Sequence, residues 1–320
     1  MRRVLIVLIA LIFCLCSCKA TATNTDLGQT PTVSALAESV PAQSAPEESL
    51  PAESLPAGSA PEVQTNIIRT FVDSKLLNKK MPINVYLPTG YTDEQKYPVL
   101  YFLHGDGAAS DDEVFSLLGL DDAAERLIAT GTIKPMIIAS VQIDRSYGVN
   151  SAEKPDIVYI QDQGINVGMY ESYVTTEAVP FIDANYSTVS SKEGRYIGGI
   201  SMAGFAALHI AFRNTELFSK VGGHSPAVDS AIIPYKLLFP TADAVNEGDP
   251  NKISQIKDLS GLKIWLDCGD KDPYCQNGTK ILQSILEEMN WDVEYLVGSG
   301  EHNNDYWQSN LEKYLAFYNS

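Results

Sequence analysis

Short apolar runs alternate with amphipathic stretches from residue 66 to the end of the chain. Two early runs, residues 66–73 and 83–87, predict a pair of strands at the start of the fold. The later predicted strands are 97–104, 136–142, 195–200, 220–223, 262–267 and 293–297. The predicted helices are 112–130, 170–186, 202–214, 277–289 and 305–318.

This alternation of strand and helix from residue 97 onward predicts an α/β fold. Its sheet is expected to be mostly parallel, with helices on both faces. The strand sequences agree, because runs such as YPVLYFLH at 97–104 are apolar throughout instead of alternating. Strands that are buried on both sides have this composition, and parallel strands are buried in that way. Residues 63–320 are therefore predicted to form one domain, large enough to bury a sizeable hydrophobic core.

The first 62 residues lack this pattern. Residues 1–18 begin with Arg2 and Arg3 and continue with an apolar run that is shorter than the roughly 20 residues of a membrane span. This layout is typical of a signal peptide. The run ends in LCSC, which resembles the lipobox of bacterial lipoproteins and implies acylation of Cys18 and a lipid-anchored, extracytoplasmic protein. A plain secretory signal and an uncleaved anchor are the alternatives.

Residues 19–62 have a different composition again. Proline recurs at 41, 46, 51, 56 and 61, with Ala, Ser and Glu between the prolines. The segment has no aromatic residue and little to bury, which predicts a disordered tether.

Charge and composition narrow the function. The chain has 23 Lys and Arg against 40 Asp and Glu, a net charge of −17, and this acidic balance argues against a nucleic-acid partner. Contact with a membrane is expected only through the lipid anchor. No HExxH motif, CxxC motif or cluster of His and Asp ligands is present, so the sequence predicts neither a metal nor another cofactor.

The strongest chemical signal is the segment GGISMAG at residues 198–204. A predicted strand ends, Ser201 occupies a sharp turn between small residues, and a helix begins. This is the layout of a nucleophile elbow with the pattern G-x-S-x-G. Ala203 stands where the second glycine is usual, and Gly204 follows it. Alanine still permits the close approach of strand and helix, so we predict that Ser201 is a catalytic nucleophile.

A serine nucleophile needs a histidine base, and only four histidines are present. His302 lies in a loop between the last predicted strand and the last predicted helix, where the base of such a fold is expected. His104 is expected to brace the loop that follows its strand. His209 lies too far along its helix to reach the serine, and His224 follows a strand soon after the serine, so both are predicted to be structural.

An acid must orient His302, and it is expected in the loop after the penultimate strand. Asp267, Asp270 and Asp272 compete for this role. We favour Asp272, which lies deep enough in the loop to face the histidine, with Asp270 second.

The remaining part of the site is an oxyanion hole made by two N–H donors. The backbone N–H of Met202, directly after the nucleophile, is one candidate. The second is the backbone N–H of Asp106, in the glycine-flanked loop after the strand 97–104. The aromatic side chains of Tyr147, Tyr306 and Trp307 are candidates for lining the site, or for packing in the core or at the rim.

Cys268 and Cys275 flank the acid-bearing loop. Outside the cytoplasm we expect a disulfide between them, which would hold Asp272 in place. Two unpaired cysteines are the alternative.

Taken in order, the HG loop, the GISMAGF elbow, the GDKD turn and the GEHNNDYW ending resemble the putative-esterase family of the α/β hydrolases. The family includes esterase D-type enzymes, feruloyl and acetyl-xylan esterases, enterochelin esterases and mycolyltransferases. The resemblance spans roughly residues 81–318. It implies a triad of Ser201, His302 and Asp272, with Met202 and Asp106 as oxyanion donors.

The function that this resemblance implies is a serine esterase, and the N-terminal signal segment places it outside the cytoplasm. Its expected substrates are carboxylic esters on small molecules or polysaccharides, with acetyl, feruloyl or other acyl groups. The alternatives are an inactive surface-binding protein on a hydrolase scaffold, or an acyltransferase.

Overall fold

The computed structural model describes residues 66–106, 110, 112–151, 165–228 and 258–320. The predicted signal segment, Cys18 and the predicted tether lie outside these residues. Within the described ranges, the structure contains no helix that is both long and apolar enough to cross a membrane.

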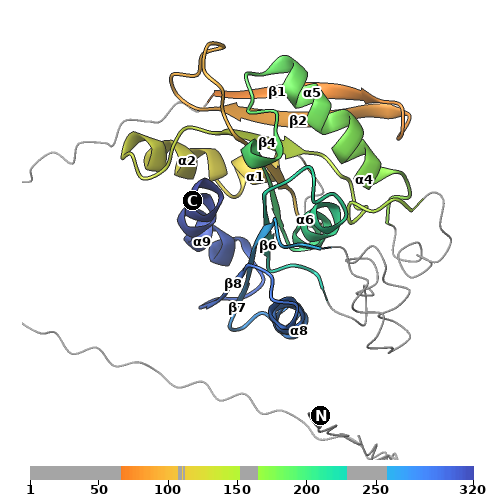
Figure 1. Cartoon of the computed structure of the whole chain (residues 1–320), viewed down its shortest axis with the longest axis vertical. Helices are drawn as coiled ribbons and strands as arrows, with labels where there is room; N and C mark the ends of the chain where they lie inside the picture. The colour runs from red at the N-terminus through yellow and green to blue at the C-terminus, as the bar shows by residue number, and fades with distance from the viewer. Residues whose placement is uncertain (1–65, 107–109, 111, 152–164, 229–257) are drawn as a thin grey trace, which may run out of the picture. The chain divides into compact units, whose positions relative to one another are not determined.

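An eight-stranded sheet forms the centre of the described fold, in the order β1-β2-β4-β3-β5-β6-β7-β8 (Figure 1). Its strands are β1 (Asn66–Ser74), β2 (Lys79–Leu87), β3 (Val99–Leu103), β4 (Ile137–Val141), β5 (Arg195–Ile200), β6 (Lys220–His224), β7 (Lys263–Gly269) and β8 (Val293–Gly298). β2 pairs antiparallel with both β1 and β4, and all pairings from β4 to β8 are parallel. The predicted strand pair and the mostly parallel sheet are confirmed.

The helices largely follow the predicted segments. They are α1 (Glu113–Ser116), α2 (Leu120–Ala129), α4 (Tyr170–Tyr173), α5 (Val179–Asn185), α6 (Met202–Arg213), α8 (Gln276–Glu288) and α9 (Asn304–Asn319). A π-helical turn, η1 (Val174–Ala178), joins α4 to α5, and a short 3-10 turn, η2 (Lys192–Gly194), precedes β5.

Two predicted helices are interrupted. The segment 112–130 is divided into α1 and α2 because Gly119 has a left-handed backbone with φ of 70°. The segment 170–186 contains the π-helical turn, which ends two residues before Pro180. Proline has no N–H to donate to the preceding turn, so the ordinary helical hydrogen-bond ladder is locally disrupted there.

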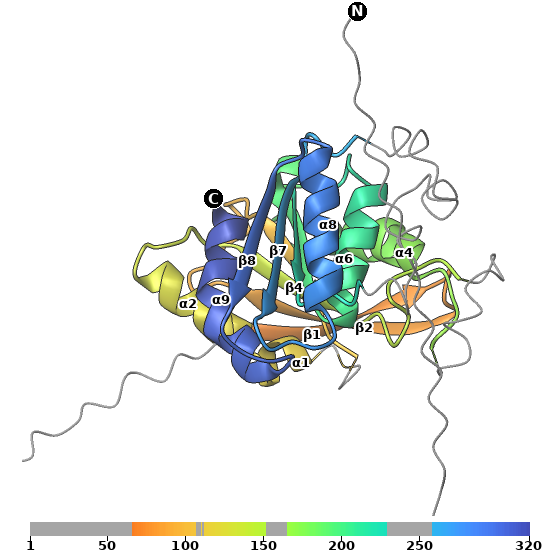
Figure 2. The same cartoon turned by 90° about the horizontal axis from the view of Figure 1, so that it is seen from below.

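Helices cover both faces of the sheet, as predicted (Figure 2). The central strand β3 shows why: Val99, Tyr101 and Leu103 belong to one buried cluster, whereas Leu100 and Phe102 belong to another. The first cluster includes side chains of α4, α5, α6 and α8, and the second includes those of α1, α2 and α9. The apolar, non-alternating strand sequences therefore reflect burial on both sides.

One side chain of α9 reaches into the middle of the sheet. The hydroxyl of Tyr318 occupies the space beside Gly198 of β5 and Gly222 of β6. A Cβ atom added at these glycines would lie 1.9 Å and 2.0 Å from that oxygen, respectively. Only glycine fits at either position while Tyr318 is present, and this close fit fixes α9 against the strand that leads to Ser201.

Candidate active site

Ser201 lies in a strained turn between β5 and α6. Its backbone angles are φ 55° and ψ −119°, a conformation that residues other than glycine rarely adopt. The turn is held by backbone hydrogen bonds, because Ser201 N donates to His224 O at 2.9 Å and Ala227 N donates to Ser201 O at 3.0 Å. The surrounding structure thus supports a conformation that projects the Ser201 hydroxyl from the end of β5.

The alanine at position 203 is accommodated by a glycine that faces it. A Cβ atom added at Gly199 would lie 2.8 Å from the Ala203 methyl group and 2.6 Å from the Ala203 carbonyl oxygen. Because Gly199 has no side chain, the first turn of α6 still approaches β5 closely. The departure from G-x-S-x-G therefore leaves the geometry of the elbow intact.

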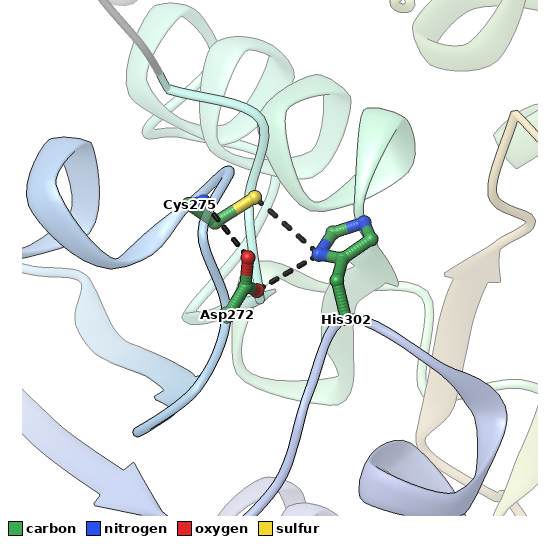
Figure 3. Close-up of side chains that lie close together, drawn as sticks. All are labelled: Asp272, Cys275 and His302. Carbon is green, nitrogen blue, oxygen red and sulfur yellow. Dashed lines mark hydrogen bonds and ion pairs between the residues drawn. The ribbon is translucent and has the colours of Figure 1, made fainter. Parts of the chain in front are cut away.

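The structure brings Ser201, His302 and Asp272 together in one hydrogen-bonded chain. Ser201 Oγ lies 2.8 Å from His302 Nε2, and His302 Nδ1 lies 2.8 Å from Asp272 Oδ2. Figure 3 shows that His302 comes from the loop before α9, whereas Asp272 comes from the loop before α8. The rings of Tyr274 and Trp307 pack edge-on against the imidazole, with centroids 5.7 Å and 5.1 Å away, and hold its orientation.

Asp272 is buried and remains an anion. Burial alone would raise its pKa, but the hydrogen bond and positive charge of His302 lower it. The N–H groups of Cys275 and Tyr274 donate to Oδ1 at 3.0 Å and 2.9 Å and act in the same direction. The net effect is a lowered pKa, so the carboxylate is available to stabilise an imidazolium ion.

The two competing aspartates have other partners. Asp267 is fully buried in β7 and accepts a hydrogen bond from His224 at 2.7 Å. Asp270 Oδ1 accepts a hydrogen bond from Gly300 N at 2.9 Å, which ties the loop after β7 to the loop after β8. Only Asp272 faces His302.

Two backbone N–H groups are available near the serine. Met202 is the first residue of α6, and the first N–H groups of a helix have no partner within it. Among the described residues, no acceptor receives a hydrogen bond from Met202 N or Asp106 N. Asp106 lines the same pocket as Ser201. This arrangement suits a pair of donors for an anionic oxygen.

An ion pair, which sequence reasoning missed, fixes the Asp106 loop. Arg145, in the loop after β4, binds the Asp106 carboxylate with two guanidinium nitrogens, and the Nη2–Oδ2 distance is 2.9 Å. The hydrogen bond to Asp106 is the main reason why the pKa of Arg145 is raised. The pair neutralises a carboxylate that would otherwise oppose negative charge developing beside Ser201. Nothing in the spacing of positions 106 and 145 signals this contact.

A pocket of about 630 Å³ opens beside Ser201 and His302. The described residues that line it are Gly105, Asp106, Glu113, Leu117, Ile200, Ser201, His302, Asn303, Asn304, Asp305 and Trp307. Of the three aromatic residues that the sequence suggested, Trp307 lines the pocket. Tyr306 is buried with its hydroxyl bonded to Asp267 at 2.9 Å, and Tyr147 packs edge-on against Phe205. Glu113, which the sequence did not single out, also lines the pocket.

The predicted disulfide between Cys268 and Cys275 is not formed, so that prediction is wrong. Both residues are in the thiol form and contact different groups. Cys268 Sγ lies 3.8 Å from the Tyr295 hydroxyl, and burial raises the pKa of Cys268 to about 11. Cys275 Sγ lies 3.6 Å from His302 Nδ1. The acid loop is held by the N–H bonds to Asp272 and not by a bridge.

Among the described residues, Asp272, Cys275 and His302 form a group that could hold a metal ion (Figure 3). One ligating atom of each lies within 4.8 Å of the others. However, the Nδ1 atom of His302 already bonds to Asp272, and the second carboxylate oxygen accepts two N–H bonds. The hydrogen-bonded chain to Ser201 accounts for this cluster, and the absence of a metal cofactor stays a prediction.

The other three histidines have the structural roles that the sequence indicated. His104 braces its loop: its Nε2 accepts a hydrogen bond from Ile143 N at 3.1 Å, and Nδ1 lies 2.9 Å from Gly105 O. His209 is buried, with Nε2 3.2 Å from Glu171 Oε2. His224 is fully buried in contact with Asp267.

A serine, a histidine and an aspartate at the carboxyl ends of strands in a mostly parallel sheet define the α/β-hydrolase class. The sequence matches the family described as "Putative esterase" over residues 74–318. The chain belongs to that family.

Individual relatives agree with this assignment. An endo-1,4-beta-xylanase/feruloyl esterase of Xylanibacter ruminicola is 30% identical over 258 residues, which cover 78% of this chain and 30% of the relative. The chain therefore spans less than a third of the length of that relative. A solved ferulic acid esterase shares the fold with a TM-score of 0.65 and 25% identity, covering 80% of this chain and 99% of that one.

A second solved structure is the ferulic acid esterase of Anaeromyces mucronatus in complex with ferulic acid. The two proteins are 19% identical and superpose with a TM-score of 0.61, and the match covers 81% of this chain and 92% of the other. At this identity the likeness concerns the fold.

Proposed function

We propose that the chain is a serine esterase that hydrolyses carboxylic esters through Ser201, His302 and Asp272. The observation that carries this proposal is the continuous hydrogen-bonded chain from Ser201 Oγ through His302 to Asp272, with both distances at 2.8 Å. The strained elbow, which presents the serine beside a pocket, and the esterase family support it further.

The reaction follows from this geometry. His302 Nε2 takes the Ser201 proton while Oγ attacks the ester carbonyl carbon. Asp272 stabilises the resulting imidazolium, and the N–H groups of Met202 and Asp106 stabilise the negative oxygen. The imidazolium then gives its proton to the departing alcohol, which leaves an acyl group on Ser201. Water, deprotonated by His302, releases the acid and restores the serine.

For the substrate, we propose esters of small molecules or polysaccharides, with feruloyl and acetyl groups as the first to test. The name of the relative from Xylanibacter ruminicola includes feruloyl esterase, and the structure from Anaeromyces mucronatus contains ferulic acid. A carbohydrate alcohol would fit an enzyme placed outside the cytoplasm.

That placement is also a proposal, supported by the sequence alone. The basic start, the apolar run and the LCSC segment favour a lipoprotein anchored through Cys18. Incorporation of labelled palmitate in the producing cell tests the anchor. Equal incorporation into Cys18→Ala would argue against it.

The decisive experiment compares two serine variants. The wild type is expected to hydrolyse p-nitrophenyl acetate and to react with a fluorophosphonate probe, and Ser201→Ala is expected to lose about 10⁶-fold in kcat and all labelling. Ser225→Ala is the matched control, because Ser225 also has a positive φ of 43° and its buried hydroxyl has no partner among the described residues. The proposed esterase function would be rejected if Ser201→Ala kept its activity. It would also be rejected if the folded wild type showed neither hydrolysis nor labelling.

A further inference from the structure

Glu113, at the start of α1, is a buried carboxylate in the wall of the pocket beside Ser201. Its residue is 6% exposed. One oxygen, Oε2, accepts a hydrogen bond from Gly105 N at 2.7 Å. The other oxygen receives no hydrogen bond or ion pair from any described residue. Burial raises the pKa of Glu113, against the lowering effect of the Gly105 N–H. One of the two carboxylate oxygens is thus left for a ligand.

A second buried polar group of the same pocket also lacks a partner. Trp307 is 6% exposed, and its indole N–H finds no acceptor in the part of the chain that the structure describes. That nitrogen is covered by the surrounding protein, so the group that this pocket wall offers to a ligand is the unused oxygen of Glu113. A hydroxyl group of a ligand can donate a hydrogen bond to that oxygen.

The charges around the pocket favour an uncharged ligand. Its described lining contains the carboxylates of Asp106, Glu113 and Asp305 and no Lys or Arg. Arg145 neutralises Asp106, and Asp305 is exposed to water, which screens its charge. Glu113 is only 6% exposed and forms no ion pair with a described residue. Its charge therefore acts most strongly on a group bound in the pocket.

We propose that Glu113 is a substrate-binding residue that accepts a hydrogen bond from a hydroxyl group of the ester and disfavours esters carrying a carboxylate on the group in this pocket. The proposal rests on the esterase function proposed above. Hydrogen bonds from a hydroxyl to an ionised carboxylate are among the stronger ones. A like charge in a poorly solvated pocket is repelled, and such repulsion is a common source of specificity.

Two matched series of esters test the proposal. One has the variable group on the alcohol side: 3-methylphenyl, 3-(hydroxymethyl)phenyl and 3-carboxyphenyl acetate. The other has it on the acyl side, as methyl esters of the corresponding substituted benzoic acids. In at least one series, wild-type kcat/KM divided by the rate of hydroxide-catalysed hydrolysis is expected to be highest for the hydroxymethyl compound and lowest for the carboxylate.

Glu113→Gln removes the charge but keeps an amide oxygen that can accept from Gly105 N. It is expected to raise the carboxylate-to-hydroxymethyl ratio of kcat/KM by about tenfold, the effect of one unit charge at roughly 6 Å in a partly solvated site. Asp305→Asn is the matched control from the same pocket, and its ratio is expected to change less than about twofold, since solvent screens an exposed charge.

A ratio within twofold of wild type in both series for Glu113→Gln would overturn the proposal, as would an equally large shift for Asp305→Asn. If Glu113→Gln does not fold, the wild type decides: no preference for hydroxymethyl over carboxylate in either series overturns the proposal. Calorimetric Kd ratios of the same esters with Ser201→Ala separate the two hypotheses. If Ser201→Ala binds the hydroxymethyl ester more tightly than the carboxylate ester but the wild type hydrolyses neither, the binding role of Glu113 stands and the proposed esterase activity is rejected.

Discussion

The described part of the chain contains two histidine–aspartate pairs with nearly the same hydrogen bond but different surroundings. His302 Nδ1 lies 2.8 Å from Asp272, and His224 Nδ1 lies 2.7 Å from Asp267. The far nitrogen of His302 meets Ser201 Oγ at 2.8 Å, beside the pocket. The far nitrogen of His224 meets the Tyr318 hydroxyl at 3.1 Å, and the pair is fully buried.

The aspartates differ as strongly as the histidines. Asp272 accepts its remaining bonds from the backbone of its own loop. Asp267 accepts bonds from the indole of Trp265 and the hydroxyls of Tyr306 and Tyr314, at 2.8–2.9 Å. These three donors come from β7 and α9 and tie the helix to the sheet. A histidine–aspartate hydrogen bond therefore does not by itself make a catalytic pair. The group at the far nitrogen decides its role.

Replacing the two histidines gives the largest expected contrast. His302→Gln is expected to lower kcat about 10⁶-fold, because no other described side chain can take the Ser201 proton. The matched variant His224→Gln is expected to lower the midpoint of thermal unfolding and to keep kcat within about tenfold. Steady-state kinetics with circular dichroism check both. A folded His224→Gln that loses activity as severely would show that the second pair takes part in the chemistry.

Asp272→Asn is expected to lower kcat about 10⁴-fold while the protein remains folded. The amide can hydrogen-bond to His302, but it favours the wrong tautomer and does not stabilise the imidazolium. Single-turnover measurement of acylation is the direct test. A loss of less than tenfold would return Asp270 to consideration, and Asp270→Asn is the control that should leave kcat nearly unchanged.

Asp267→Asn is expected to act on stability. Four donors would lose a buried charged acceptor, and the free energy of unfolding should fall by about 3–5 kcal/mol. The kcat of the remaining folded enzyme should stay within about tenfold of wild type. Urea denaturation, with activity normalised to active sites by fluorophosphonate titration, measures both quantities. An unchanged denaturation midpoint would mean that the network around Asp267 contributes little to folding.

The smallest expected effect is a pH dependence of stability that belongs to Asp272. Its pKa is lowered in the folded protein, so its ionised form stabilises the fold above the unfolded value of about 3.9. This contribution is lost as the pH falls through the lowered pKa. The difference in unfolding free energy between wild type and Asp272→Asn should therefore shrink in acid, as measured by denaturation at several pH values. A difference that grows toward low pH would contradict the assigned direction.

Much of the fold was readable from the sequence because burial on both faces leaves a strong signal. The runs that became β3, β4 and β5 are mostly apolar and do not alternate, and their observed bounds differ from the predicted ones by at most two residues. The triad was readable because the order of its members and the small residues around Ser201 follow from the fold. Asp272 was favoured from its place in the loop, but Asp270 stayed the second candidate, since only the loop conformation decides which carboxylate faces His302.

Features that depend on contacts between distant residues were not readable. Arg145 binds Asp106 across two loops, and Glu113 reaches back to Gly105 from the start of a helix. Neither contact has a sequence pattern. The disulfide was predicted wrongly because closeness in sequence does not fix the direction of a side chain. Cys275 points to the imidazole, whereas Cys268 points to β8 through Tyr295.

The position of the Tyr318 hydroxyl has a consequence for how this family can change over time. Gly198 belongs to the glycine-rich segment before Ser201, yet a methyl group there would collide with Tyr318 and not with any part of the triad. A descendant that had abandoned hydrolysis would still need this glycine for as long as it kept the tyrosine. A glycine at position 198 of a related protein would then indicate that the packing of α9 is kept. Only the presence of Ser201, His302 and Asp272 would indicate that the catalytic chemistry is kept.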